Sequence, residues 1–182
     1  MAGQSRAREA QTGGNVFLRV VATLSSLAGW CSASMIVCAV GLTCQMIFIR
    51  FVLNGSTVWQ TEAVVYLMVG ATLLGLPYVQ RLRGHVNVDL IPLVFRGTAR
   101  RVLAIITLSV SIAIVAVMLW YGYEYWHLAW SKNWRSDTVW GVQLWIPYLA
   151  LPIGFGLFLL QLIADLVAVI LRVDAPFGLE EK

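Results

Sequence analysis

The chain has 182 residues, of which 59% are hydrophobic and only 12% are charged, with a formal net charge of +4. A soluble domain usually has about 25% charged residues, so this composition excludes an ordinary soluble domain. It predicts an integral membrane protein, and the length allows four to five spans with short loops. The basic residues form no tract interleaved with exposed aromatic rings, so we expect no nucleic-acid binding.

Four apolar segments predict transmembrane helices, since about 20 such residues cross a bilayer. They lie at residues 20–49, 58–80, 102–123 and 145–171. The predicted fold is therefore an all-α integral membrane protein with four transmembrane helices and interfacial helical segments in its loops. We expect the aromatic-rich third helix to continue as, or bend into, an interfacial helix to about Lys132. Residues 1–19 and 172–182 are expected to be terminal tails.

The distribution of basic residues predicts the orientation in the membrane. If both termini are cytoplasmic, ten basic residues face the cytoplasm, five of them between Arg81 and Arg101. Only Arg50, Lys132 and Arg135 then face the outside. This asymmetry satisfies the positive-inside rule. We therefore expect cytoplasmic termini and a tryptophan-rich loop on the outer face.

Local patterns predict how the first two helices begin and pack. Ser25, Gly29 and Ala33 are four residues apart, and small residues at this spacing allow a neighbouring helix to approach closely. Thr57 and Gln60 fit a capping box at the start of the second helix. Cys31, Cys38 and Cys44 form no C-x-x-C pair, so we interpret them as packing residues.

A search for catalytic, cofactor or metal residues returns no candidate. Every acidic residue of the helical region lies at or near the end of a predicted span, whereas a self-sufficient transporter needs a site near the midplane. His85 falls in a loop and His127 lies beyond the third span, so neither is placed as an axial haem ligand. His85 and Asp89 together supply too few ligands for a metal. We predict a non-enzymatic protein without cofactors.

A few polar residues are candidates for structural or partner contacts. Glu62 either forms a salt bridge with a partner or only caps its helix. Gln161 and Asp165 are four residues apart on the last helix, and we expect them to bond to each other and to a neighbouring helix, since lone polar groups in lipid are costly. The alternative is that Asp165 reaches the headgroups. Arg81 and Arg83 are expected to be topology anchors, with a specific contact as the alternative.

Motifs from Arg50 to Leu171 resemble a known transporter family. Arg50–Asn54 matches an Arg-aromatic-x-x-Asn motif, and Trp59 with Glu62 matches a tryptophan followed by an acidic pair. Residues 83–90, which include His85 and Asp89, match a basic–Gly–His–Val–x–Val–Asp–Leu segment. The last helix opens with a Trp-x-Pro-Tyr-x-x-x-Pro-x-Gly motif at Trp145–Gly154. Together these motifs resemble the small membrane subunit (DctQ type) of tripartite ATP-independent periplasmic (TRAP) transporters. Thr61 and Val65 depart from the family pattern, where an acid and a base are common.

The resemblance implies a role in a three-part importer of the bacterial inner membrane. A periplasmic binding protein would capture an organic acid, and a large multi-span membrane subunit would carry it with an ion gradient, usually sodium. This chain would be the non-catalytic small subunit that braces the large one within membrane lipid. A four-helix redox or enzyme subunit is the alternative. The candidate partner-interface or structural residues are Trp59, Glu62, Arg81, Arg83, His85, Asp89, Gln161 and Asp165.

Overall fold

A computed structural model describes residues 16–82 and 98–171 as a bundle of long helices. The elements are α2 (Val16–Val52), α3 (Val58–Arg81), α5 (Thr98–Ser131), α6 (Trp145–Tyr148) and α7 (Ala150–Ile170). Four stretches are long and apolar enough to cross a membrane, which confirms the predicted four-helix membrane fold. The terminal tails before Val16 and after Leu171 lie outside the described residues, as do Arg83, His85 and Asp89.

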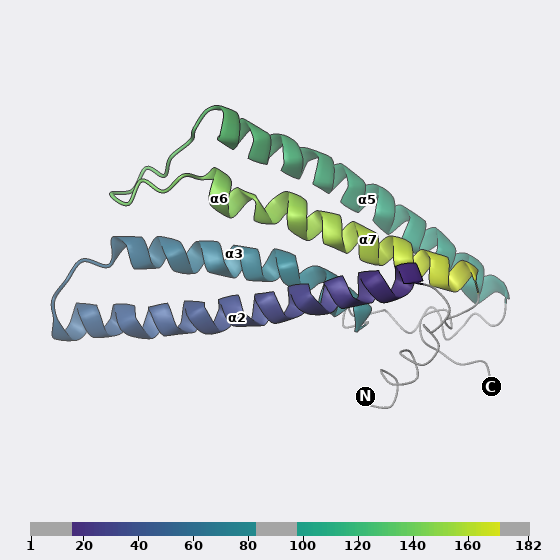
Figure 1. The fold of residues 1–182 in the computed structure, drawn as a ribbon, viewed down its shortest axis with the longest axis horizontal. Coiled ribbons are helices and arrows are strands. Elements are labelled where there is room, and N and C mark those ends of the chain that lie inside the picture. Colours follow the sequence, from purple (N-terminus) through teal and green to yellow (C-terminus); the bar gives the residue numbers. More distant parts are fainter. Residues whose placement is uncertain (1–15, 83–97, 172–182) are drawn as a thin grey trace.

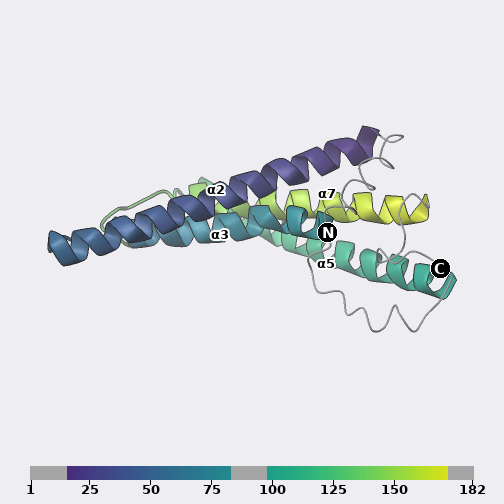
Figure 2. The same ribbon diagram turned by 90° about the horizontal axis from the view of Figure 1, so that it is seen from below.

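The bundle consists of two antiparallel helical hairpins that lie side by side (Figure 1). α2 pairs with α3, α5 pairs with α7, and α3 and α7 meet in the middle. The connections 53–57 and 132–144 lie at one end, here named the loop end, and Val16 and Leu171 lie toward the other, the terminal end. Toward the terminal end, α2 and α5 diverge on opposite sides of α7 (Figure 2). α3 and α7 therefore form the centre of the bundle.

The first helix is longer than predicted, and the third begins before the predicted residue 102 and continues, as predicted, to about Lys132. α2 begins at Val16 and ends at Val52, and α5 runs without a break from Thr98 to Ser131. At 1.5 Å per residue α2 is about 55 Å long, well above the roughly 30 Å of a hydrocarbon core. A helix of this length tilts or projects beyond the core. The aromatic segment at the end of α5 thus continues the span as a straight extension.

The fourth span is divided by a turn at Leu149 into α6 and α7. Pro152 explains the break, because it has no N–H to bond the Tyr148 carbonyl four residues earlier and its ring crowds that carbonyl. The ordinary helical bond from the Leu149 amide to the Trp145 carbonyl remains at 3.1 Å, with a second bond to the Ile146 carbonyl at 3.3 Å. The predicted single helix at 145–171 is therefore two helical segments that continue one another.

Small residues on α2 form the seam against the rest of the bundle. Its buried residues follow a heptad-like spacing: Leu18, Val21, Ser25, Ala28, Ser32 and Ala39. This is the spacing of left-handed helix pairs. The predicted face is correct at Ser25, and at Gly29, where an added Cβ would lie 2.5 Å from the Tyr78 ring. Ala33 is exposed and lies outside this seam, because a seam of period 3.5 drifts away from a strict four-residue stripe.

α3 and α7 approach each other closely at Gly154. Pro77 is buried inside α3 and cannot donate to the carbonyl of Leu73. Gly154 of α7 lies against that carbonyl, since a Cβ at this position would lie 2.9 Å from the Leu73 oxygen and 2.8 Å from its Cβ. Only a residue without a side chain allows this contact. The proline and the glycine, 77 residues apart, thus form one packing unit.

The predicted capping box at the start of α3 is not formed. Thr57 precedes the helix, but its side chain makes no capping hydrogen bond. Gln60 is buried at 2% exposure, and its Oε1 atom has no partner within the described part of the chain. The side chain of Gln60 therefore packs into the interior and does not fold back over the first turn.

Candidate functional site

A chain of polar side chains joins three helices near the terminal end. Ser25 of α2 donates to Gln161 Oε1 of α7 at 2.7 Å, and both side chains are buried. Gln161 Nε2 donates to Asp165 Oδ1 at 2.9 Å. Gln80 of α3 donates to Asp165 Oδ2 at 3.0 Å. These four residues are named the three-helix clasp. The predicted contact between Gln161 and Asp165 is present, and it extends to two neighbouring helices.

Arg81 continues this polar layer at the last residue of α3. Its guanidinium donates to the Ala22 carbonyl of α2 at 3.0 Å and to the Ser26 hydroxyl. The side chain is half-buried. A basic residue at a helix end is usually a topology anchor, but here Arg81 also makes a specific contact with a neighbouring helix. It holds the end of α3 against α2.

The clasp fixes the relative positions of α2, α3 and α7 along the bundle axis. Interhelical hydrogen bonds in membranes contribute about 0.6 kcal/mol each on average and about 1.7 kcal/mol at most. Two bonds cross between helices, Ser25 to Gln161 and Gln80 to Asp165. Their sum is modest, but a shift of one helical turn would leave each group without its partner in a region of low polarity. The clasp therefore specifies the packing register more than it adds stability.

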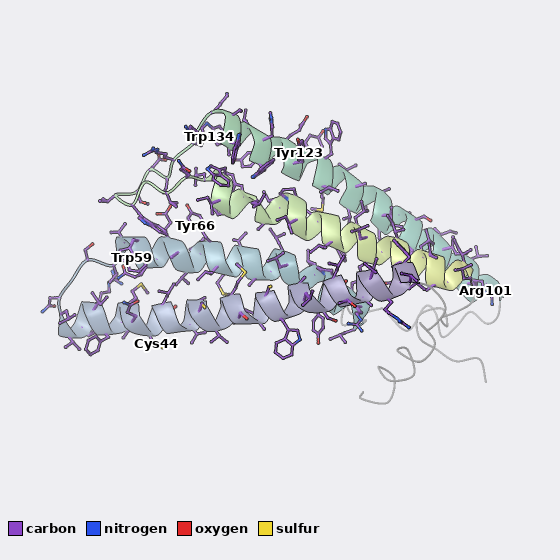
Figure 3. All side chains as sticks on the ribbon, in the orientation of Figure 1. Cys44, Trp59, Tyr66, Arg101, Tyr123 and Trp134 are labelled. Atoms are coloured by element: carbon purple, nitrogen blue, oxygen red, sulfur yellow. The ribbon has the colours of Figure 1, made fainter. Side chains whose placement is uncertain are left out.

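Glu62 forms a second polar cluster, at the loop end. Its carboxylate accepts hydrogen bonds from the Tyr66 hydroxyl of α3 and from the Thr138 hydroxyl of the connection 132–144. Tyr66 projects between α3 and α6 (Figure 3). Ser136 supports Thr138, since their hydroxyl groups are 3.1 Å apart. In the described part of the chain, Glu62 therefore attaches a loop to its helix, a role that the sequence analysis did not consider.

Aromatic rings extend this attachment across the loop end. Trp59 of α3 lies 6.0 Å from Trp140 of the connection, measured between ring centroids. Trp130 of α5 meets Trp145 of α6 edge-on at 4.6 Å. Such pairs contribute about 0.5–1.5 kcal/mol beyond their buried area. Trp59, expected as a partner or structural residue, is thus placed in a contact within the chain.

The described residues contain no group of three His, Cys, Asp or Glu side chains that could hold a metal ion. Cys31, Cys38 and Cys44 are free and exposed on the surface of α2, and Figure 3 marks Cys44 on that helix. Within each of the two clusters, the polar side chains form hydrogen bonds with one another. Their arrangement is suited to holding helices and a loop in place.

Comparison with known proteins gives the family. Residues 39–172 match the family described as tripartite ATP-independent periplasmic transporters, DctQ component. This region covers most of the chain. The chain belongs to this family.

A curated relative of this DctQ family member is the C4-dicarboxylate TRAP transporter small permease protein DctQ of Vibrio cholerae serotype O1 (strain ATCC 39315 / El Tor Inaba N16961). The two are 23% identical over 137 residues, which are 64% of this chain and 59% of the relative. The matched region thus spans about three fifths of the relative's length. With its four apolar spans, this DctQ protein is a multi-pass membrane protein.

Several residues of the two clusters were not predicted from the sequence. The family match begins at residue 39, so it does not include Ser25 or Ser26 of α2. Thr138 carries no motif, and Gln80 is an ordinary residue near the end of a span. The sequence indicated Ser25 only as a small packing residue, and the position of Gln80 beside an arginine near the end of a span was the other signal. Of the predicted residues, the structure brings Gln161 and Asp165 into one cluster and Trp59 and Glu62 into the other.

Proposed function

We propose that this DctQ protein is the non-catalytic small subunit of a TRAP-type importer of the bacterial inner membrane. It braces a large multi-span membrane subunit, which takes up an organic acid with an ion gradient, usually sodium. A periplasmic binding protein delivers the acid. Both termini of the small subunit are cytoplasmic, and the loop end faces the periplasm. The family membership supports the assignment to a TRAP system.

One observation carries the bracing role: the polar side chains of the three-helix clasp bond to one another across helices and hold the bundle together. Ser25, Gln80, Gln161 and Asp165 bond across three helices. A solute or ion site would need polar groups directed at a cavity near the midplane. The two clusters lie toward opposite ends of α3, the central helix. A bundle fixed at both ends is a suitable rigid support for a moving neighbour.

The outer surface of the bundle exposes apolar side chains that can contact a partner protein or lipid. Side chains such as Val37, Val110 and Ile114 are 71%, 53% and 57% exposed. In the 18-residue apolar stretch of α2 only 6% of residues are buried inside the bundle, and in that of α5 only 11%. Small-residue and apolar faces of this kind pack against other membrane helices or lipid. α2 and α5 therefore offer the broadest surfaces for a large subunit.

A co-purification experiment tests the assignment. The chain, carrying an affinity tag, is expressed in its native host and is isolated with its bound partners in mild detergent. We expect the large subunit to co-elute in constant proportion, and deletion of this chain to abolish uptake of the cognate acid by cells. Full uptake without the chain contradicts the proposal. A haem, quinone or metal that co-purifies in stoichiometric amount would instead support a redox subunit.

A further inference from the structure

The connection 132–144 is an ordered hairpin that folds back along α3. The amide of Ser136 bonds the Val142 carbonyl at 2.9 Å, and the amide of Leu144 bonds the Trp134 carbonyl at 2.9 Å. Gly141, with φ +58°, closes the turn, and its amide bonds the Thr138 carbonyl at 3.0 Å. Much of the backbone of the hairpin is thus paired internally, which is what a segment in a region of low polarity requires.

The contacts of the hairpin place its tip beside the first turns of α3. Thr138 bonds Glu62, and Trp140 lies against Trp59. The neighbouring residue Thr61 donates to the sulfur of Met46 in α2 at 3.3 Å. The tip therefore lies at the level of residue 46 of α2. This level is more than one helical turn inside the end of α2 at Val52.

The apolar surface of α2 continues beyond this level. Phe48, Phe51 and Val52 are 57%, 82% and 60% exposed. Burying one such side chain is worth about 1.5–3 kcal/mol, so three of them on the surface of a membrane protein indicate that this part of α2 lies in the apolar layer, against lipid or another membrane helix. The membrane boundary at the loop end therefore lies no deeper than these residues. The tip of the hairpin lies at or inside that boundary.

The exposed side chains of the hairpin are of the types that membrane proteins place in the lipid headgroup layer. Val139 at the tip is 96% exposed and Trp140 is 43% exposed. Lys132 and Arg135 are also exposed, as is Arg50 at the same end of α2. Tryptophan settles at the boundary between lipid and water, and basic side chains pair with lipid phosphates there. The hairpin continues the apolar outer surface of the spans into this layer.

We infer that residues 132–144 form an interfacial hairpin that is embedded in the lipid headgroup layer at the loop end. Val139 and Trp140 contact the upper part of the acyl chains, and Lys132 and Arg135 contact lipid phosphates. Glu62 and Trp59 hold the hairpin at this depth. The inference rests on the membrane-spanning fold and not on the proposed transport partners. It can therefore fail while the proposed function stands, and the reverse also holds.

The test measures the depth of the hairpin in a bilayer. The full-length chain, together with any membrane subunit that co-purifies, is placed in nanodiscs of phosphatidylethanolamine and phosphatidylglycerol. Ala replaces Cys31, Cys38 and Cys44, and one Cys labelled with bimane is introduced at a time. Val139→Cys and Asp137→Cys report on the hairpin, and neither change disturbs packing because both side chains are exposed. Nitroxide-labelled lipids quench the fluorescence of bimane that lies in the bilayer, and iodide quenches the fluorescence of bimane that is exposed to water.

Two matched positions calibrate the measurement. Ser56→Cys lies in the exposed connection 53–57, and Ile114→Cys lies on the exposed surface in the middle of α5. We expect bimane at Val139→Cys to be quenched by nitroxide near the headgroups, with iodide quenching several-fold weaker than at Ser56→Cys. Bimane at Ile114→Cys should be quenched by nitroxides that are attached deep in the acyl chains. Strong iodide quenching at Val139→Cys, equal to that at Ser56→Cys, overturns the inference. Quenching by neither reagent also overturns it, since a protein would then cover the tip.

Discussion

Replacing Gly154 by Ala should force the two helical hairpins apart where α3 and α7 meet. The added Cβ would lie 2.8 Å from the Leu73 Cβ and 2.9 Å from the Leu73 oxygen. These atoms belong to the backbone and first carbon of α3, so they cannot move aside as the end of a flexible side chain can. Overpacking of this kind costs about 1–3 kcal/mol. The α3–α7 contact must open for the variant to fold.

Gly156 is the matched control on the same helix. A Cβ at Gly156 would lie 4.0 Å from the nearest side-chain atom, a methyl of Leu119. Both changes gain the same helix propensity, of about 1 kcal/mol in water, so this contribution cancels in the comparison. The difference in the free energy of unfolding between the two variants therefore isolates the steric cost, which we expect to be about 1–3 kcal/mol.

The assay is unfolding of the purified full-length chain in mixed micelles by increasing fractions of sodium dodecyl sulfate. Tryptophan fluorescence and circular dichroism report the transition. Gly154→Ala should unfold at a lower fraction of the denaturing detergent than Gly156→Ala, which should unfold at or above the fraction that unfolds the wild type. If Gly154→Ala is as stable as Gly156→Ala, the close approach of α3 and α7 is wrong.

Three further predictions concern the clasp, the loop attachment and the orientation. Gln161→Leu should lower the free energy of unfolding by about 1–2 kcal/mol, because it removes the hydrogen bonds of Gln161 to α2 and within α7. The control Gln45→Leu, on the exposed surface of α2, should change it by less than about 0.5 kcal/mol. Equal effects of the two changes in the same detergent unfolding assay would argue against the clasp. Glu62→Ala should release the connection 132–144 from α3 and speed trypsin cleavage within this connection in sealed vesicles. Glu124→Ala, which changes an exposed glutamate of α5, should leave the cleavage rate unchanged. If Glu62→Ala also leaves it unchanged, Glu62 does not attach the connection to α3. In cells, a Ser56→Cys variant should react with a membrane-impermeant maleimide added from the periplasmic side, and labelling only after lysis would reverse the orientation.

The fold was predictable because its signals are local. Length and hydropathy are enough to place a membrane span, and the charge-free middle of the third segment predicted its helix correctly. The break at Leu149 was also within reach, since it follows from Pro152 and the carbonyl of Tyr148 four residues earlier. The prediction of one helix over residues 145–171 did not follow the consequence of this proline.

The two clusters were only partly predictable, because their contacts join distant positions. The i, i+4 spacing of Gln161 and Asp165 indicates a contact within one helix, but nothing in the sequence links them to Ser25, 136 residues away. Glu62 was expected to cap its helix or to contact a partner. A sequence motif identifies such a residue but does not show which residue it contacts in the fold. Thr138 could be found only once the fold had brought the loop back to α3.

The central claim is that this chain supports a transporter and does not transport alone. The direct measurement is uptake of a labelled organic acid into proteoliposomes under an inward sodium gradient, with the loaded binding protein outside. Three preparations are compared: the large subunit alone, this chain alone, and the two together. The account predicts uptake only by the two together. Full uptake by the large subunit alone, or any gradient-driven uptake by this chain alone, would contradict it.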